Sequence, residues 1–312
     1  MPPAKRKKKR VKRGRKKATL LYFLLALLVV LTLGATFFFL FIGPRGGKVA
    51  DRKPHLQYEQ SPAIGEFTLP PVKPAPLPTI LPKSEKSAPE ATTKPSLIAI
   101  VIDDMGYQKA LGLQFLAIDS PLSFSFLPYA PFTDLLMREA KRRQRDILLH
   151  IPLEPHDSSW NLGPGALLTA MPAEEMDRIF AKDLSRVPFA IGVNNHMGSK
   201  FTENTKAMTI LLTALKKHNL FFLDSITTTG SVGFELAERM QIPAGRRNVF
   251  LDNKTDRELV LQQLNTLVRL SRKHGSAIGI AHPKGGSLAA LRQFVKELPP
   301  DIELTAVHRL LM

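Results

Sequence analysis

The 312-residue chain contains no cysteine and only one tryptophan. The absence of cysteine excludes disulfides, thiolate zinc sites and a cysteine nucleophile. No GxGxxG pattern follows the first apolar run of the C-terminal part, and no GxSxG pattern surrounds Ser225. These two absences argue against a glycine-rich phosphate site after that run and against a serine hydrolase.

Charged residues are also absent from residues 18–43, which are rich in Leu, Phe and Val. This stretch exceeds the roughly 20 residues that cross a ~30 Å hydrocarbon core. Residues 5–17 directly before it contain eleven Lys or Arg, which is a strong positive-inside signal. We therefore expect residues 1–17 to be a cytoplasmic tail and residues 18–43 to be a single-pass anchor in the bacterial inner membrane. A cleaved signal peptide is the alternative, although its apolar region would be about 7–15 residues long.

The net charge of +17 comes mainly from this basic tail. Because a topology signal explains the tail, we expect no nucleic-acid partner. Residues 44–95 hold 11 of the 25 prolines and are expected to form an extended, semi-rigid linker on the periplasmic side. Disorder without any functional reach is the alternative for this segment.

Residues 96–312 contain six short apolar runs that stop on acids, imidazoles or amides. Continuous apolar runs are typical of parallel strands that are covered by helices on both faces. Catalytic groups of parallel α/β folds collect where such strands end. We therefore expect one polar crater, built from the residues that follow the runs: Asp103 and Asp104, His150, Asn194 to His196, Asp224 and Ser225, Asp252 and Asn253, and His282.

Helical patterns alternate with these runs, and this alternation predicts parallel βαβ units. The predicted fold is α/β, a distorted or incomplete (β/α) barrel with seven or so parallel strands; an open doubly wound sheet is the alternative. Thr255 and Glu258 suggest a capping box at one helix start, and the connection around Trp160 suggests a wall beside the crater. The predicted helices cover residues 107–118, 132–143, 173–186, 203–218, 255–273 and 286–297.

Three of the polar groups suggest a metal site. Of the pair Asp103 and Asp104, one carboxylate can bind a metal while the other takes a proton from water, although an Asp pair also caps helices. His150 is a candidate ligand or a structural histidine, and Glu154 a less favoured ligand that alternatively hydrogen-bonds to one. With His196, these residues offer the Asp, His, His set of a hydrolytic zinc site.

The remaining polar groups suggest substrate contacts and proton transfer. Asn194, Asn195, Ser199 and Ser225 are candidate hydrogen-bond partners of a substrate, or simply turn residues. His282 is a candidate acid for the leaving group, and either Asp224 or Asp252 is expected to orient it. Strand-end caps are the plainer interpretation of both aspartates.

The motifs IDDMGY, LLHIPLEP, GVNNHMGS, FLDSIT, FLDN and IGIAHP resemble those of the divergent polysaccharide deacetylases of bacteria. The resemblance implies a zinc-dependent carbohydrate esterase on a distorted (β/α)7 barrel, with Asp103 as base, Asp104 as ligand and His282 as acid. His150 and Glu154 stand where the better-known relatives carry two histidines, and the Arg-x-Pro motif of those relatives is absent. His196 is the residue that would replace the missing ligand.

The expected function is therefore a membrane-anchored periplasmic hydrolase that uses a divalent metal, with zinc preferred. Its substrate would be an acetylated envelope polysaccharide, a peptidoglycan-like glycan or an amino sugar. The alternative is a catalytically degenerate domain that binds cell-envelope carbohydrate or acts as a scaffold.

Overall fold

The computed structural model describes residue 32 and residues 94–311. The predicted basic tail lies outside this part of the chain, as do the predicted membrane anchor except Thr32 and nearly all of the proline-rich linker. No helix among the described residues is long and apolar enough to cross a membrane.

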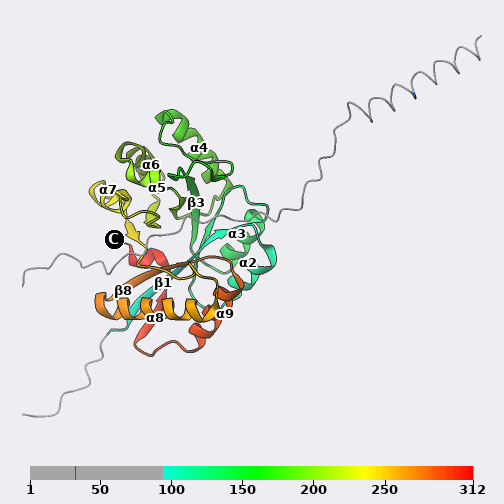
Figure 1. Cartoon of the computed structure of the whole chain (residues 1–312), viewed down its shortest axis with the longest axis vertical. Coiled ribbons are helices and arrows are strands. Elements are labelled where there is room, and N and C mark those ends of the chain that lie inside the picture. The colour runs from blue at the N-terminus through cyan, green and yellow to red at the C-terminus, as the bar shows by residue number, and fades with distance from the viewer. Residues whose placement is uncertain (1–31, 33–93, 312) are drawn as a thin grey trace, which may run out of the picture. The chain divides into compact units, whose positions relative to one another are not determined.

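The core of this region is one sheet whose paired strands all run parallel (Figure 1). The strand order is β6-β5-β4-β3-β2-β1-β8-β7, and β9 pairs with β1. All six apolar runs lie in strands, but three further short strands raise the number above the seven or so expected. The strands are β1 (Ser96–Met105), β2 (Ser123–Phe126), β3 (Ile147–Leu153), β4 (Gly192–Met197), β5 (Phe221–Asp224), β6 (Ala244–Arg246), β7 (Val249–Phe250), β8 (Ser276–Ala281) and β9 (Ile302–Thr305).

Helices lie around the outside of the sheet, with α8 packed along β8 and β1 (Figure 1). All six predicted helical regions contain a helix; the region at 203–218 begins earlier and forms two, and α7 was not predicted. The predicted capping box is wrong, because the N-cap of α8 is Asp256, whose side chain accepts the Glu258 and Leu259 amides. The helices are α2 (Lys109–Leu116), α3 (Thr133–Arg142), α4 (Ala173–Arg186), α5 (Ser199–Glu203), α6 (Thr205–Lys217), α7 (Gly233–Arg239), α8 (Arg257–His274), α9 (Gly285–Lys296) and the 3-10 helix η2 (Val307–Leu310).

The sheet curves into the incomplete (β/α) barrel expected from the sequence. Its two outer strands, β6 and β7, are consecutive in the chain and are separated only by Arg247 and Asn248. Within the described residues no strand ladder joins β6 to β7. This seam between β6 and β7 is therefore bridged by the chain itself and not by sheet hydrogen bonds.

Two apolar clusters separate the inside of the barrel from its outside. The smaller cluster contains only residues of strands and of η2, such as Val101, Leu148, Leu223 and Ile280. The larger cluster contains the alternate strand residues, such as Ile100 and Ile102, together with the apolar faces of the helices. Because successive side chains of a strand point to opposite sides, residue parity tells which groups face the barrel interior.

Candidate active site

The crater at the carboxyl ends of the strands continues the interior rows of side chains. Two residues after the interior residues Val101, Leu148, Leu223 and Ile280 come Asp103, His150, Ser225 and His282. All four line a single hollow of about 370 Å³, together with Asn195, His196, Met197, Thr227, Arg247, Phe250 and Ile280. Some of these polar residues lie within the strands, whereas the sequence suggested that they follow the strands.

Asp104 departs from this alternation. Its parity would point it outward, to the side of Ile100 and Ile102, but its φ is +54° and the pairing of β1 with β2 shifts register between Ile102 and Met105. Register shifts in a strand pair, as in a β-bulge, redirect side chains. The positive φ and the register shift together account for the position of both neighbouring carboxylates at one site.

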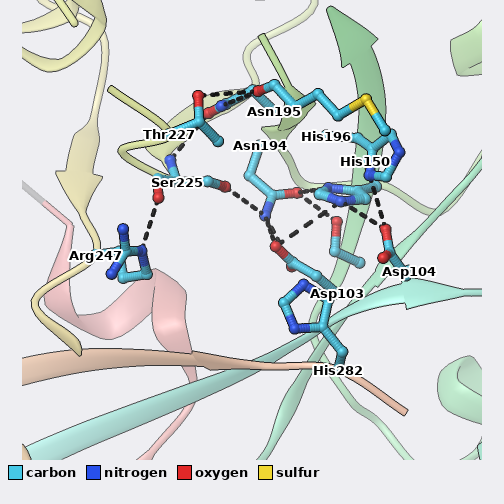
Figure 2. A network of polar contacts seen from close by, with 12 residues as sticks. Asp103, Asp104, His150, Asn194, Asn195, His196, Ser225, Thr227, Arg247 and His282 are labelled. Carbon is cyan, nitrogen blue, oxygen red and sulfur yellow. Dashed lines mark hydrogen bonds and ion pairs between the residues drawn. The ribbon is translucent and has the colours of Figure 1, made fainter. Parts of the chain in front are cut away.

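Asp104, His150 and His196 offer ligand atoms that all lie within 4.8 Å of one another (Figure 2). Asp104 Oδ1 is 3.1 Å from His150 Nε2 and 2.9 Å from His196 Nδ1. Ligand atoms around a tetrahedral zinc with 2.0–2.1 Å bonds are separated by roughly 3.3 Å. The two distances from Asp104 to the imidazole nitrogens are therefore close to those of a zinc site.

The Asp104 carboxylate is fully buried, yet neither of its oxygens has a hydrogen-bond partner in the described part of the chain. The two imidazole nitrogens reach ion-pair distance without hydrogen-bond geometry. Burial acts to raise the pKa of Asp104, but the adjacent imidazoles outweigh it and hold this pKa well below the usual range. A buried anion that is not hydrogen-bonded fits a divalent metal, which would pair with both oxygen and imidazole ligands.

Asn194 lies at the centre of the polar network and orients its members (Figure 2). Its Oδ1 lies 2.9 Å from His150 Nδ1, so this ring nitrogen donates and Nε2 is directed to Asp104. Its Nδ2 donates to both oxygens of Asp103, at 2.8 and 3.0 Å. Ser125 Oγ also donates to Asn194 Oδ1. The amide is thus engaged within the protein, and the expected contact of Asn194 with a substrate stays a prediction.

The pKa values of Asp103 and His150 are both raised. Burial raises the pKa of Asp103, and the nearby imidazoles of His150 and His282 offset this only in part. Burial acts to lower the pKa of His150, but Asp103 and Asp104 outweigh it and raise this pKa to about 9. A carboxylate with a raised pKa suits a general base.

His282 lies near Asp103 (Figure 2) and is held by Asp252. Its Nδ1 lies 2.8 Å from Asp252 Oδ1, and its backbone amide donates to Asp252 Oδ2. Ser287 Oγ also donates to that oxygen, at 2.6 Å. Of the two aspartates considered from the sequence, Asp252 is the one that orients His282.

A family model for divergent polysaccharide deacetylases matches residues 100–311. The chain belongs to this family. It is 36% identical over 214 residues to the uncharacterized protein YibQ of Escherichia coli. The matched region covers 69% of this chain and 67% of that protein. An uncharacterized protein of Haemophilus influenzae is 39% identical over 217 residues, covering 69% and 76% of the two chains. A solved structure of an uncharacterized protein from Agrobacterium tumefaciens matches with a TM-score of 0.67 and 27% identity, covering 71% and 92%.

Four residues that were expected at the site form hydrogen bonds with neighbouring parts of the protein. Asp224 faces outward, where it accepts from Ile226, Ser231 and Phe234 and caps the turn before α7. Glu154 accepts hydrogen bonds from Thr169 and from Lys200, and it does not belong to the group of three possible metal ligands. Ser199 Oγ accepts the His156 amide, and Asn195 links Met197 to Ser225. All four side chains hold loops around the crater in place.

Arg247 is a charged residue of the crater that was not expected from the sequence. It is 4% exposed and lies at the seam between β6 and β7. Its Nε and Nη2 each donate at 2.7 Å, to the carbonyl oxygens of Ser225 and Ile226. In the sequence this residue is half of an Arg-Arg pair at the start of an apolar run, which looks like a surface position. Only its place between the two edge strands indicates otherwise.

Proposed function

We propose that this protein is a metal-dependent hydrolase that removes acetyl groups from an envelope polysaccharide or amino sugar. The observation that carries the proposal is the buried Asp104 carboxylate, which lacks hydrogen bonds and lies against two imidazoles. Membership in the deacetylase family supports the reaction type. Zinc is the preferred ion because one carboxylate and two imidazoles are a usual zinc ligand set.

Asp104, His150 and His196 would hold the metal. When bound, the metal would polarise the acyl carbonyl and make water more acidic. Asp103 would accept the proton of the water molecule that attacks the carbonyl carbon. His282, held by Asp252, would donate a proton to the sugar amine as the carbon–nitrogen bond breaks, so acetate and a free amine leave the site. Asn194 would keep His150 and Asp103 in their productive orientations.

We also propose that residues 18–43 anchor the protein in the inner membrane and place the catalytic domain in the periplasm. Support comes from the uncharged apolar stretch and the basic residues before it. A reporter that is active only in the periplasm should be active when fused after Met312 and inactive when fused after Lys17. An active Lys17 fusion would reverse the proposed orientation.

The test of the reaction combines two measurements on the purified full-length chain. Metal analysis should find about one divalent ion per chain, and acetylated chito-oligosaccharides should release acetate that a chelator suppresses. Stoichiometric metal without acetate release would favour the alternative, a domain that binds envelope carbohydrate without turnover. Absence of any bound ion at physiological metal concentrations would remove the hydrolase proposal.

A further inference from the structure

Arg247 is a buried cation whose charge is not paired within the crater. In the described part of the chain no carboxylate lies within ion-pair distance of its guanidinium. Burial lowers the pKa of Arg247 to about 10, and the charges of Asp224 and Asp103 offset this only partly. A guanidinium remains protonated at neutral pH even so. An unpaired buried charge is costly and calls for a partner.

Two of the three guanidinium nitrogens hold the backbone, and the third does not. Nε and Nη2 bind the carbonyl oxygens of Ser225 and Ile226, whereas Nη1 has no hydrogen bond among the described residues. These two bonds secure a strained turn, because the β-branched Ile226 has a φ of +48°. The backbone contacts fix the guanidinium at the wall of the hollow that it lines.

The surroundings of Arg247 add a second donor and a rigid support. The Ser225 hydroxyl accepts from Asn194 Nδ2, and its own proton has no acceptor in the described region. The centroid of the Phe250 ring lies 5.2 Å from Arg247 Cζ and 5.1 Å from the centroid of the His282 ring. Arg247, Ser225 and His282 all line the same hollow as Asp103. The crater therefore has a donor-rich wall in addition to its metal-ligand group.

We propose that Arg247 and Ser225 form a subsite for a carboxylate group of the ligand. The donors that the two backbone bonds leave over, on Nη1 and the second N–H of Nη2, form a guanidinium edge that a planar carboxylate matches through parallel hydrogen bonds. A singly charged group is favoured over a phosphate dianion because Asp103 borders the same hollow. The inference rests on the proposed function in one respect: the carboxylate would belong either to an acidic acetylated sugar or to the acetate product.

Equilibrium binding to the full-length chain tests this subsite with probes that differ only in charge. N-acetylmuramic acid and its methyl ester share the acetamide, and acetate and acetamide form the corresponding small pair. If the substrate carries the carboxylate, wild-type protein should bind the acid of the first pair about 10–100-fold more tightly than its ester. Hydrogen bonds to charged groups strengthen binding by about this factor. A preference confined to acetate assigns the subsite to the product. Equal binding within both pairs overturns the proposal.

Arg247→Gln keeps amide donors for the two carbonyls but removes the charge, and it should abolish the preference for the acid. Arg246→Gln is the matched control, because Arg246 pairs with Glu235 and does not line the hollow. The titrations are repeated with a chelator: a preference that survives in Arg247→Gln and disappears on chelation belongs to the metal, which overturns the proposal. If Arg247→Gln does not fold, the comparison of acid with ester on metal-free wild type decides alone. Acetate release is scored separately, so hydrolysis without a preference refutes only the subsite.

Discussion

Two clusters of histidine and aspartate border the same crater, and they differ in how the carboxylate is satisfied. Asp252 accepts hydrogen bonds from the amide and ring of His282 and from Ser287. Asp104 lies against His150 and His196 without one hydrogen bond among the described residues. Two similar sets of residues are thus suited to different roles. A satisfied carboxylate orients an imidazole, whereas an unsatisfied one is suited to bind an ion.

A third buried carboxylate sharpens this contrast. Both oxygens of Asp183, on α4, also lack hydrogen-bond partners in the described chain. Burial raises the pKa of Asp183 to about 7, whereas the pKa of Asp104 is lowered. Asp183 lies beside Tyr129 and Gly165 and away from any grouped metal ligands. An unsatisfied carboxylate alone is therefore no sign of a metal site; the converging imidazoles decide it.

The largest effect is expected from Asp104→Asn. Loss of the only anionic ligand should weaken metal binding by more than about 100-fold, beyond the effect of losing an outer contact to a ligand. Acetate release should fall with the metal content, which is measured by elemental analysis of the purified chain. Asp183→Asn is the matched control and should leave metal content unchanged. Equal metal loss in both variants would contradict the distinction between the two carboxylates.

Asp103→Asn should retain the metal and lose turnover by about 10²–10⁴-fold, the usual contribution of a general base. The Asp103 carboxylate accepts hydrogen bonds from Asn194, and Asp103 is not one of the three proposed metal ligands. Metal content and kcat are measured on the same preparation. Stoichiometric metal with unchanged kcat would exclude Asp103 as the base.

Asp252→Asn should reduce kcat by about 10–100-fold, a part of the contribution of the acid that it orients. The metal should remain bound, because the side-chain hydrogen bonds of Asp252 go to His282 and Ser287 and not to the proposed metal ligands. His282→Gln should cause at least the same loss, and the double variant should add little to it. Additive losses in the double variant would show that the two residues do not act as one unit.

The smallest effect concerns stability and tests Asp183. Burial raises the pKa of Asp183 from its ordinary value of 3.8 to about 7, so the folded state holds this proton more tightly than the unfolded state. The contribution of this group to the free energy of unfolding must fall as pH rises from about 4 to about 7. Asp183→Asn should therefore be more stable than wild type at pH 8, on the order of 2 kcal/mol, and the difference should vanish near pH 4. Urea unfolding at both pH values measures it.

The sequence predicted the parts of the fold that depend on continuous apolar runs. All six runs are in strands and α4 has the predicted limits, but β2 was missed because its SFSF sequence buries two serines. Ser125 is buried there because it donates to Asn194. Parity along β5 would have separated Ser225, which faces the crater, from Asp224, which faces α7. The position of Asp104 had no such signal, since it depends on a positive φ at a residue other than glycine and on a shift of strand register.

The unpaired seam between β6 and β7 makes one side of the barrel the easiest to open. Local unfolding begins where few hydrogen bonds and contacts must be broken, and such openings expose amides to solvent exchange. Strands β6 and β7 are three and two residues long, and they flank Arg247 on either side. Amide protons at this seam should therefore exchange with deuterium well before those of β1, which is paired on both sides. Ligands that bridge Arg247 to the rest of the crater should slow that exchange. The exchange rate at this seam should therefore indicate whether the crater is occupied.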